Sequence, residues 1–119
     1  MYLFFNPLVA IAASQLNAQM NGVQLKVNED NLVGSECTEF DVILVGDMLY
    51  DSAISKDTVA WLRKLRAAKK TILIGDPGRG PVNDSTISSS LCSVAKYELD
   101  PITKEDNYGF HQAHVFTLC

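Results

Sequence analysis

The sequence predicts an α/β fold with a parallel sheet at its centre and an antiparallel edge. Residues 42–45 and 71–74 are two short, continuously apolar runs, and the segment between them has apolar positions at helical spacing. This β-α-β order predicts two neighbouring parallel strands, because a helix of that length can carry the chain back along the sheet. Residues 94–99 and 110–118 also look like strands, and the polar loop between them predicts an antiparallel hairpin.

The first helix is expected to begin at Asn6-Pro7 and to end at Asn21-Gly22. Asn is a favourable N-cap, Pro suits the first helical position, and Gly favours termination. Residues 23–27 alternate weakly and predict a short strand, and residues 28–39 are polar. Between the caps, apolar residues recur at helical spacing: Leu8, Ile11, Ala12, Leu16 and Met20.

The central segment supplies the most distinctive pattern. Residues 42–45 are apolar at every position, as expected of a parallel strand covered on both faces. Residues 52–70 predict an amphipathic helix with Trp61 in the core. Residues 71–74 repeat the buried-strand pattern, and both strands are followed by Gly-Asp.

The last third of the chain is expected to begin with a turn-rich loop at residues 76–81, which holds two prolines and two glycines. A short helix over residues 84–91 and the hairpin follow. His111 and His114 are three residues apart on a predicted strand. They are expected to face opposite sides, which excludes a shared metal ion and favours structural roles.

Composition excludes several classes of function. The 119 residues suffice for one small domain, and a net charge of -4 argues against a nucleic-acid surface. The basic residues at positions 63–70 are expected to form a solvated helix face. No apolar run approaches the ~20 residues of a membrane-spanning helix. Cys37, Cys92 and Cys119 have no metal-binding spacing and leave one unpaired, so a reduced compartment is the simpler interpretation.

The two Gly-Asp pairs indicate where chemistry is expected. Gly46-Asp47 and Gly75-Asp76 come at the carboxyl ends of neighbouring parallel strands. Ligands of open α/β sheets bind at those ends, where glycines allow close approach and carboxylates can bind a cation or polarise a donor. Each Asp can instead cap the turn that follows it. Both interpretations stay open for Asp47, and capping is the simpler one for Asp76.

The segment Asp47-Met48-Leu49-Tyr50 resembles the Asp-x-x-Tyr motif of the class I, seven-strand S-adenosylmethionine-dependent protein-lysine methyltransferases. Gly75-Asp76-Pro77-Gly78-Arg79 and the helix that opens at Asn6-Pro7 extend the likeness. The resemblance is greatest to the group that modifies the β subunit of electron transfer flavoprotein. It implies a Rossmann-like sheet, truncated to strands three to seven of that family.

The resemblance also implies residue roles in methyl transfer to a protein lysine. Asp47 would bind and orient the amine, and Tyr50 would align it or wall its channel; Tyr50 can equally be a packing aromatic. Gly46, Asp30 and Asn31 would lie on the cofactor side, although Asp30 and Asn31 are more simply loop caps. Asp76 and Arg79 would meet the protein substrate, although Arg79 is more simply exposed.

A Gly-x-Gly turn before Asn6 is missing, and Phe4 occupies the position where the family has an acid for the cofactor ribose. Residues 1–119 are therefore expected to form a partial methyltransferase domain without the N-terminal cofactor-binding strands. Binding of S-adenosylmethionine is expected to be weak or absent. The strand at residues 42–45 would keep an unpaired edge, open to self-association.

The resemblance implies the mitochondrial matrix as location, although the sequence shows no import signal and is otherwise compatible with the cytoplasm. No membrane or nucleic-acid partner is expected. Two alternatives stay open from the sequence. One is a non-catalytic binding module derived from such an enzyme. The other is an unrelated flavodoxin-like α/β domain, in which both Gly-Asp pairs are ordinary strand ends.

Overall fold

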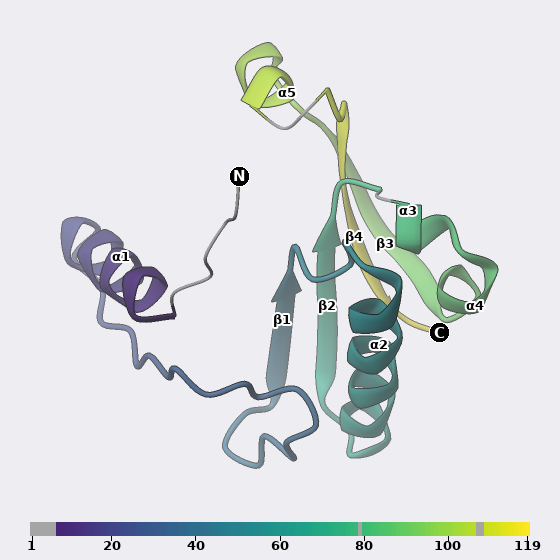
Figure 1. Ribbon diagram of the computed structural model, residues 1–119, viewed down its shortest axis with the longest axis horizontal. Coiled ribbons are helices and arrows are strands. Elements are labelled where there is room, and N and C mark those ends of the chain that lie inside the picture. Colours follow the sequence, from purple (N-terminus) through teal and green to yellow (C-terminus); the bar gives the residue numbers. More distant parts are fainter. Residues whose placement is uncertain (1–6, 79, 107–108) are drawn as a thin grey trace. The chain divides into compact units, whose positions relative to one another are not determined.

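The computed structural model describes residues 7–78, 80–106 and 109–119 (Figure 1). The chain divides into two compact units, Met1–Leu32 and Val33–Cys119. Each unit is described by itself. Among the described residues, no helix has the length and apolar character needed to cross a bilayer.

The first unit contains one helix, α1 (Pro7–Met20), as predicted; its expected N-cap, Asn6, lies outside the described residues. The helix ends in a left-handed Gly22, with φ of 66°. The Gly22 amide donates to the Gln19 carbonyl at 3.1 Å, and the Val23 amide donates to the Ala18 carbonyl at 3.0 Å. This pair of bonds is the Schellman motif, which explains why the helix stops at Asn21-Gly22.

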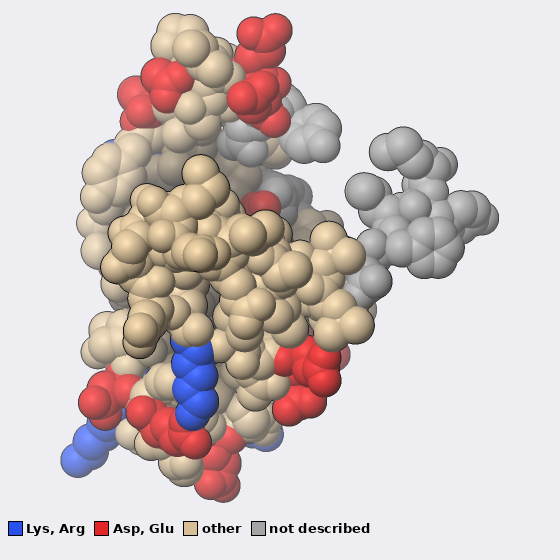
Figure 2. Space-filling model, turned by 90° about the vertical axis from the view of Figure 1, so that its left-hand side faces the viewer, with Lys and Arg blue, Asp and Glu red and all other residues tan. Residues whose placement is uncertain are grey.

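The surface of α1 carries no charge, because its 14 residues include no Lys, Arg, Asp or Glu. Figure 2 shows it as an uncharged region of surface. Leu16 and Met20 are 61% and 85% exposed, and only Ala18 is buried. The prediction of a strand at residues 23–27 is wrong, because that segment is irregular and pairs with no strand among the described residues.

The second unit is built on a four-stranded mixed sheet with the order β1-β2-β4-β3. Its strands are β1 (Val42–Gly46), β2 (Thr71–Asp76), β3 (Leu91–Glu98) and β4 (Gln112–Leu118). β1 and β2 are parallel, and β4 runs antiparallel to both β2 and β3. The parallel centre and the antiparallel hairpin are confirmed, and the fold is α/β.

One face of this sheet is covered by α2 (Ser52–Ala67). The helix buries Val59, Leu62 and Leu65, and these side chains join Ile72 and Ile74 of β2 in the core. Trp61 is half-buried and packs against this core, while its indole N–H donates to the Ser35 carbonyl at 2.8 Å. Trp61, predicted to lie in the core, is therefore found at the border of the core.

Within the described residues of the second unit, the opposite face of β1 is not covered, contrary to the expectation from its continuous apolar run. Ile43 packs against the core and Val45 is 8% exposed, whereas Val42 and Leu44 are 52% and 74% exposed. Successive strand residues point to opposite faces of the sheet. The core on the α2 side therefore covers the apolar side chains on one face of β1 only.

Three short helices complete the second unit: α3 (Gly80–Asn83), α4 (Ser85–Ser88) and α5 (Pro101–Asp106). The helix expected over residues 84–91 is shorter than predicted, because β3 already begins at Leu91. The helix α5 was not predicted; it lies in the connection between β3 and β4, at the far end of the hairpin (Figure 1).

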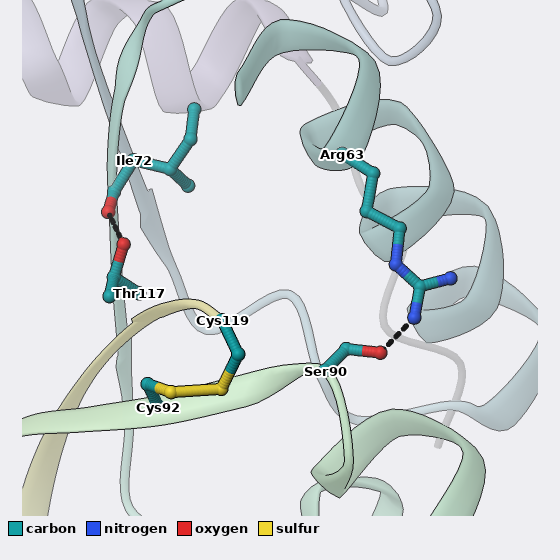
Figure 3. The surroundings of a disulfide bond; sticks show 6 residues. All are labelled: Arg63, Ile72, Ser90, Cys92, Thr117 and Cys119. Carbon is teal, nitrogen blue, oxygen red and sulfur yellow. Dashed lines mark hydrogen bonds between the residues drawn. A yellow bond between two sulfur atoms is a disulfide. The ribbon is translucent and has the colours of Figure 1, made fainter. Parts of the chain in front are cut away.

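Two of the three cysteines form a disulfide, Cys92–Cys119, and only Cys37 is free (Figure 3). The expectation of reduced cysteines is therefore wrong for this pair. The antiparallel register places Cys92 opposite Thr117, two residues before Cys119. Because the two cysteines are 27 residues apart in sequence, local spacing could not reveal the pairing.

Candidate functional site

The carboxyl ends of β1 and β2 meet at one end of the sheet (Figure 1). The parallel register pairs Gly46 with Gly75, so the two Gly-Asp steps lie side by side. The Asp47 amide, the first after β1, donates to the Gly75 carbonyl at 3.4 Å. The prediction that both Gly-Asp pairs lie at the carboxyl ends of neighbouring strands is therefore correct. Open α/β sheets bind their ligands at these strand ends.

The loop after β1 directs its polar side chains outward and its apolar ones inward. Leu49 is completely buried, and Met48 packs against the core. Asp47 is exposed, and Tyr50 is 55% exposed. That exposure exceeds what a packing aromatic beneath the next helix would show. Both side chains are therefore accessible from solution.

Asp47 has an unusual backbone conformation, with φ of 60°. This left-handed region is uncommon for residues other than glycine, although Asp and Asn tolerate it best. It costs roughly 1–2 kcal/mol per residue and must be stabilised by its surroundings. The chain turns sharply there, directly after the strand, and leaves the Asp47 side chain at the rim of the sheet.

The loop is fixed at its far end by the start of α2. The Asp51 carboxylate accepts hydrogen bonds from the backbone amides of Ala53 and Ile54, at 2.9 and 3.1 Å. This is an N-cap, which satisfies two of the free amides of the first turn. The sequence analysis missed it, although Asp-Ser before an amphipathic pattern is a recognisable signal. Leu49 and Asp51 together position Tyr50.

Gly46 leaves space on the open side of the strand end. A Cβ added to Gly46 would meet no atom within 4 Å, whereas one at Gly75 would meet the Val45 carbonyl oxygen at 4.0 Å. A group from outside the chain can therefore approach the backbone at Gly46 closely. This open space is compatible with the predicted place of Gly46 on the cofactor side of the site.

Asp76 is placed differently from Asp47. It is 3% exposed, and its Oδ1 accepts a hydrogen bond from the Gly78 amide at 2.8 Å. The turn-capping interpretation is therefore what the structure shows for this carboxylate. Arg79, the other residue predicted on the substrate side, lies outside the described residues.

Asp30 and Asn31, predicted on the cofactor side, belong to the first unit and are both exposed. The Asp30 amide donates to the Asn28 side-chain oxygen at 2.8 Å, which forms a local turn. The turn is thus capped by Asn28 and not by the Asp30 carboxylate. Asp47, by contrast, belongs to the second unit.

A cavity of about 660 Å³ begins at the loop after β2 and was not predicted. Its lining includes Gly78, His111, His114 and Phe116. The ring of His114 stacks on that of Phe116, with centroids 5.5 Å apart. Gly78 is close to the same ring: a Cβ there would lie 3.8 Å from His114 Nε2. Four of the twelve residues that line the cavity are Phe or His, and none of the twelve is Lys, Arg, Asp or Glu.

The prediction that His111 and His114 face opposite sides is wrong, because both line this cavity. The reason is that β4 begins at Gln112, so His111 precedes the strand and does not follow its alternation. No set of three or more His, Cys, Asp or Glu within residues 7–78, 80–106 and 109–119 is arranged to hold a metal ion.

Comparisons with known proteins identify relatives but no family model and no solved structure that matches. The chain is 38% identical over 113 residues to the electron transfer flavoprotein beta subunit lysine methyltransferase of Danio rerio, which covers 93% of the chain and 43% of the relative. The Xenopus laevis protein of that name is 33% identical, covering 98% of the chain and 49% of the relative. The Homo sapiens protein is 29% identical, covering 93% and 43%.

The chain therefore spans about half the length of the curated relatives it matches. The matches make it a relative of part of this methyltransferase family, as the Asp-x-x-Tyr segment suggested. They do not favour the flavodoxin-like alternative or the non-catalytic module.

Proposed function

We propose that this relative of the electron transfer flavoprotein β-subunit lysine methyltransferases is the carboxy-terminal part of a class I domain that methylates a protein lysine, with the β subunit of electron transfer flavoprotein as substrate. The observation that carries the proposal is the loop at residues 47–50. Buried Leu49 anchors it, and exposed Asp47 and Tyr50 stand at the carboxyl end of the parallel strands. By resemblance, the location proposed is the mitochondrial matrix.

S-Adenosylmethionine, when bound, would supply a transferable methyl group on a positively charged sulfur. The lysine must be neutral to accept it. With a pKa of ~10.4, only about one free lysine in a thousand is neutral near physiological pH, a cost of roughly 4 kcal/mol. The proton leaves to solvent before transfer.

Asp47 cannot lower that cost by its charge, because a carboxylate favours the ammonium form. Its proposed role is to bind the incoming ammonium group and orient it. Tyr50, three residues later, is proposed to align the amine once the proton has gone. Positioning of this kind accounts for much of the catalysis of displacement reactions, and a misplacement of about 1 Å can cost roughly 100-fold in rate.

The sheet supports the class I assignment. A parallel centre with an antiparallel C-terminal hairpin is what the resemblance implies for the end of such a domain. The residues present fit the cofactor only in part: Gly46 leaves room for close approach. The described residues of the second unit include none that would hold the ribose and methionine ends of the cofactor. Weak or absent binding to this chain alone is therefore proposed, and calorimetric titration that finds micromolar affinity would contradict it.

The function is tested in a hybrid enzyme. The matching segment of the Danio rerio relative is replaced by this chain, and methylation of the flavoprotein β subunit is followed by the mass of the substrate. Asp47→Asn is expected to lower kcat/KM by about 100-fold, since it removes the group that orients the amine. Asp57→Asn, an exposed position on α2, is the matched control and should leave the rate unchanged. Full activity of the Asp47→Asn hybrid would refute the assignment.

A further inference from the structure

The disulfide joins the two strands of the β3–β4 hairpin at its open end, where Leu91 pairs with Leu118 (Figure 3). Cys92 is in β3, and Cys119 directly follows β4, with their Cα atoms 5.2 Å apart. Both residues are exposed, whereas Cys37, the only free cysteine, is half-buried and lies 3.1 Å from the Ser35 hydroxyl. A small thiol in solution can thus reach the disulfide directly.

We propose that Cys92 and Cys119 form a reversible thiol–disulfide exchange site that reacts with thiols of the glutathione class. A glutathione thiolate attacks one sulfur of the bond and forms a mixed disulfide, while the other cysteine leaves as a thiolate and takes a proton. A second glutathione then attacks the mixed disulfide. The protein gains two thiols, and two glutathione molecules become one oxidised glutathione. The reverse steps restore the bond.

The surrounding contacts allow the chain to remain folded in both states. The Cys119 amide donates to the Ser90 carbonyl at 2.9 Å, and the Thr117 hydroxyl donates to the Ile72 carbonyl at 2.8 Å. The Arg63 guanidinium also donates to the Ser90 hydroxyl (Figure 3). Leu118 is 2% exposed. None of these interactions needs the disulfide, so reduction removes one of several restraints on the end of β4.

The restraint matters because β4 also contributes to the cavity. His114 and Phe116 lie on β4 and line it, and Leu91, next to Cys92, lines it as well. Strand ends open locally at low free-energy cost when they lose a restraint. Reduction is therefore expected to loosen the end of β4 and, with it, this wall of the cavity. The inference is independent of methyl transfer.

The test equilibrates the full chain in buffers of reduced and oxidised glutathione and counts alkylated thiols by intact mass. In oxidising buffers one thiol, that of Cys37, should be alkylated. In reducing buffers all three cysteines should be alkylated. Amide hydrogen exchange in β4 should become at least several-fold faster on reduction, with β1 unchanged. The proposal would be overturned if the disulfide never formed, or if it persisted in millimolar reduced glutathione. It would also be overturned if amide hydrogen exchange in β4 were the same in the oxidised and reduced protein.

Three variants separate this site from general effects of oxidation. The double variant Cys92→Ser with Cys119→Ser should show the fast β4 exchange in every buffer. Cys37→Ser should keep the full response, and a loss of response in it would contradict the assignment. If the double variant fails to fold, Cys119→Ser alone gives the same comparison, because one remaining cysteine of the pair cannot close the bond.

Discussion

The two edge strands of the sheet, β1 and β3, differ in charge and in the regularity of their pairing. β3 is eight residues long, includes Lys96 and Glu98, and has an irregular register between Ser93 and Ala95. Charged residues and bulges of this kind discourage pairing with another chain. β1 has five residues, Val-Ile-Leu-Val-Gly, and none is charged. β3 is thus an edge suited to solvent, whereas β1 has the character of an interior strand.

The difference sets β1 apart at the strand end where the candidate site lies. The uncovered face of β1 ends at Gly46, where there is open space, and Asp47 follows. Parallel strands with continuous apolar runs are normally covered on both faces. In the second unit, β1 has this apolar composition although α2 covers only one of its faces.

The largest effect is expected from two leucines near this edge. Leu49 is completely buried, and Leu44, five residues earlier, is 74% exposed. Leu49→Ala should lower the free energy of unfolding by about 2–5 kcal/mol, because it leaves a cavity in the core. Leu44→Ala should change it by only about 0.5 kcal/mol or less. Urea denaturation measures both, and equal losses would mean that the face of β1 is covered after all.

A second prediction concerns self-association through β1. In antiparallel pairing of two copies centred on Leu44, Val42 lies opposite Gly46. Asp47 turns away from the strand, with φ of 60°, but the Asp41 of each copy still comes to the same end of the pair as the Asp47 of the other. Like charges held directly opposite each other are destabilising by roughly 0.2–1 kcal/mol per pair, which sets the scale of the repulsion. The two aspartates that flank this uncharged strand therefore oppose symmetric pairing. The backbone hydrogen-bonding groups along the outer edge of β1 favour it.

Removing both charges should strengthen association. Asp41→Asn with Asp47→Asn should raise the dimerisation constant by roughly 2-fold to 30-fold, since two repulsive pairs are removed. Sedimentation velocity measures the change. The matched control, Asp57→Asn with Glu105→Gln, removes the same charge from exposed positions elsewhere. If the control dimerises as strongly, net charge and not the flanks of β1 sets the self-association.

Much of the second unit could be predicted from the sequence because its signals are local. The apolar runs in β1 and β2 and the two Gly-Asp steps located the parallel strands and their shared end. The location of Asp47 and the capping role considered for Asp76 followed from the same positions. The connection containing α5 also carried a signal, Asp100-Pro101, that the sequence analysis overlooked.

Other features depend on contacts that local sequence does not encode. Residues 23–27 have a weak strand pattern, but a strand exists only with a hydrogen-bonded neighbour, and they have none among the described residues. The disulfide depends on the register of β3 with β4. The placement of both His111 and His114 along the cavity depends on β4 beginning at Gln112, one residue after His111. The outward exposure of Tyr50 depends on the burial of Leu49.

The smallest predicted effect lies beyond β3, where Asp100 caps α5. Its carboxylate accepts hydrogen bonds from the Thr103 hydroxyl at 2.6 Å and the Thr103 amide at 2.9 Å. The side-chain bond, followed by the backbone bond, lowers the pKa of Asp100 below its usual 3.8. A lowered pKa means that the stabilising contribution is complete above 3.8 and is lost as the pH falls through the folded-state pKa.

The tip of the hairpin should therefore loosen in acid while β1 and β2 stay ordered. The Thr103 amide resonance, followed by NMR, should titrate with a midpoint below 3.8. Asp100→Asn should abolish that titration, because the amide has no proton to gain in this range. A midpoint at or above 3.8 would show that the cap does not favour the charged carboxylate. Because Asp100 is fully exposed, the change should stay confined to α5 and leave the sheet intact.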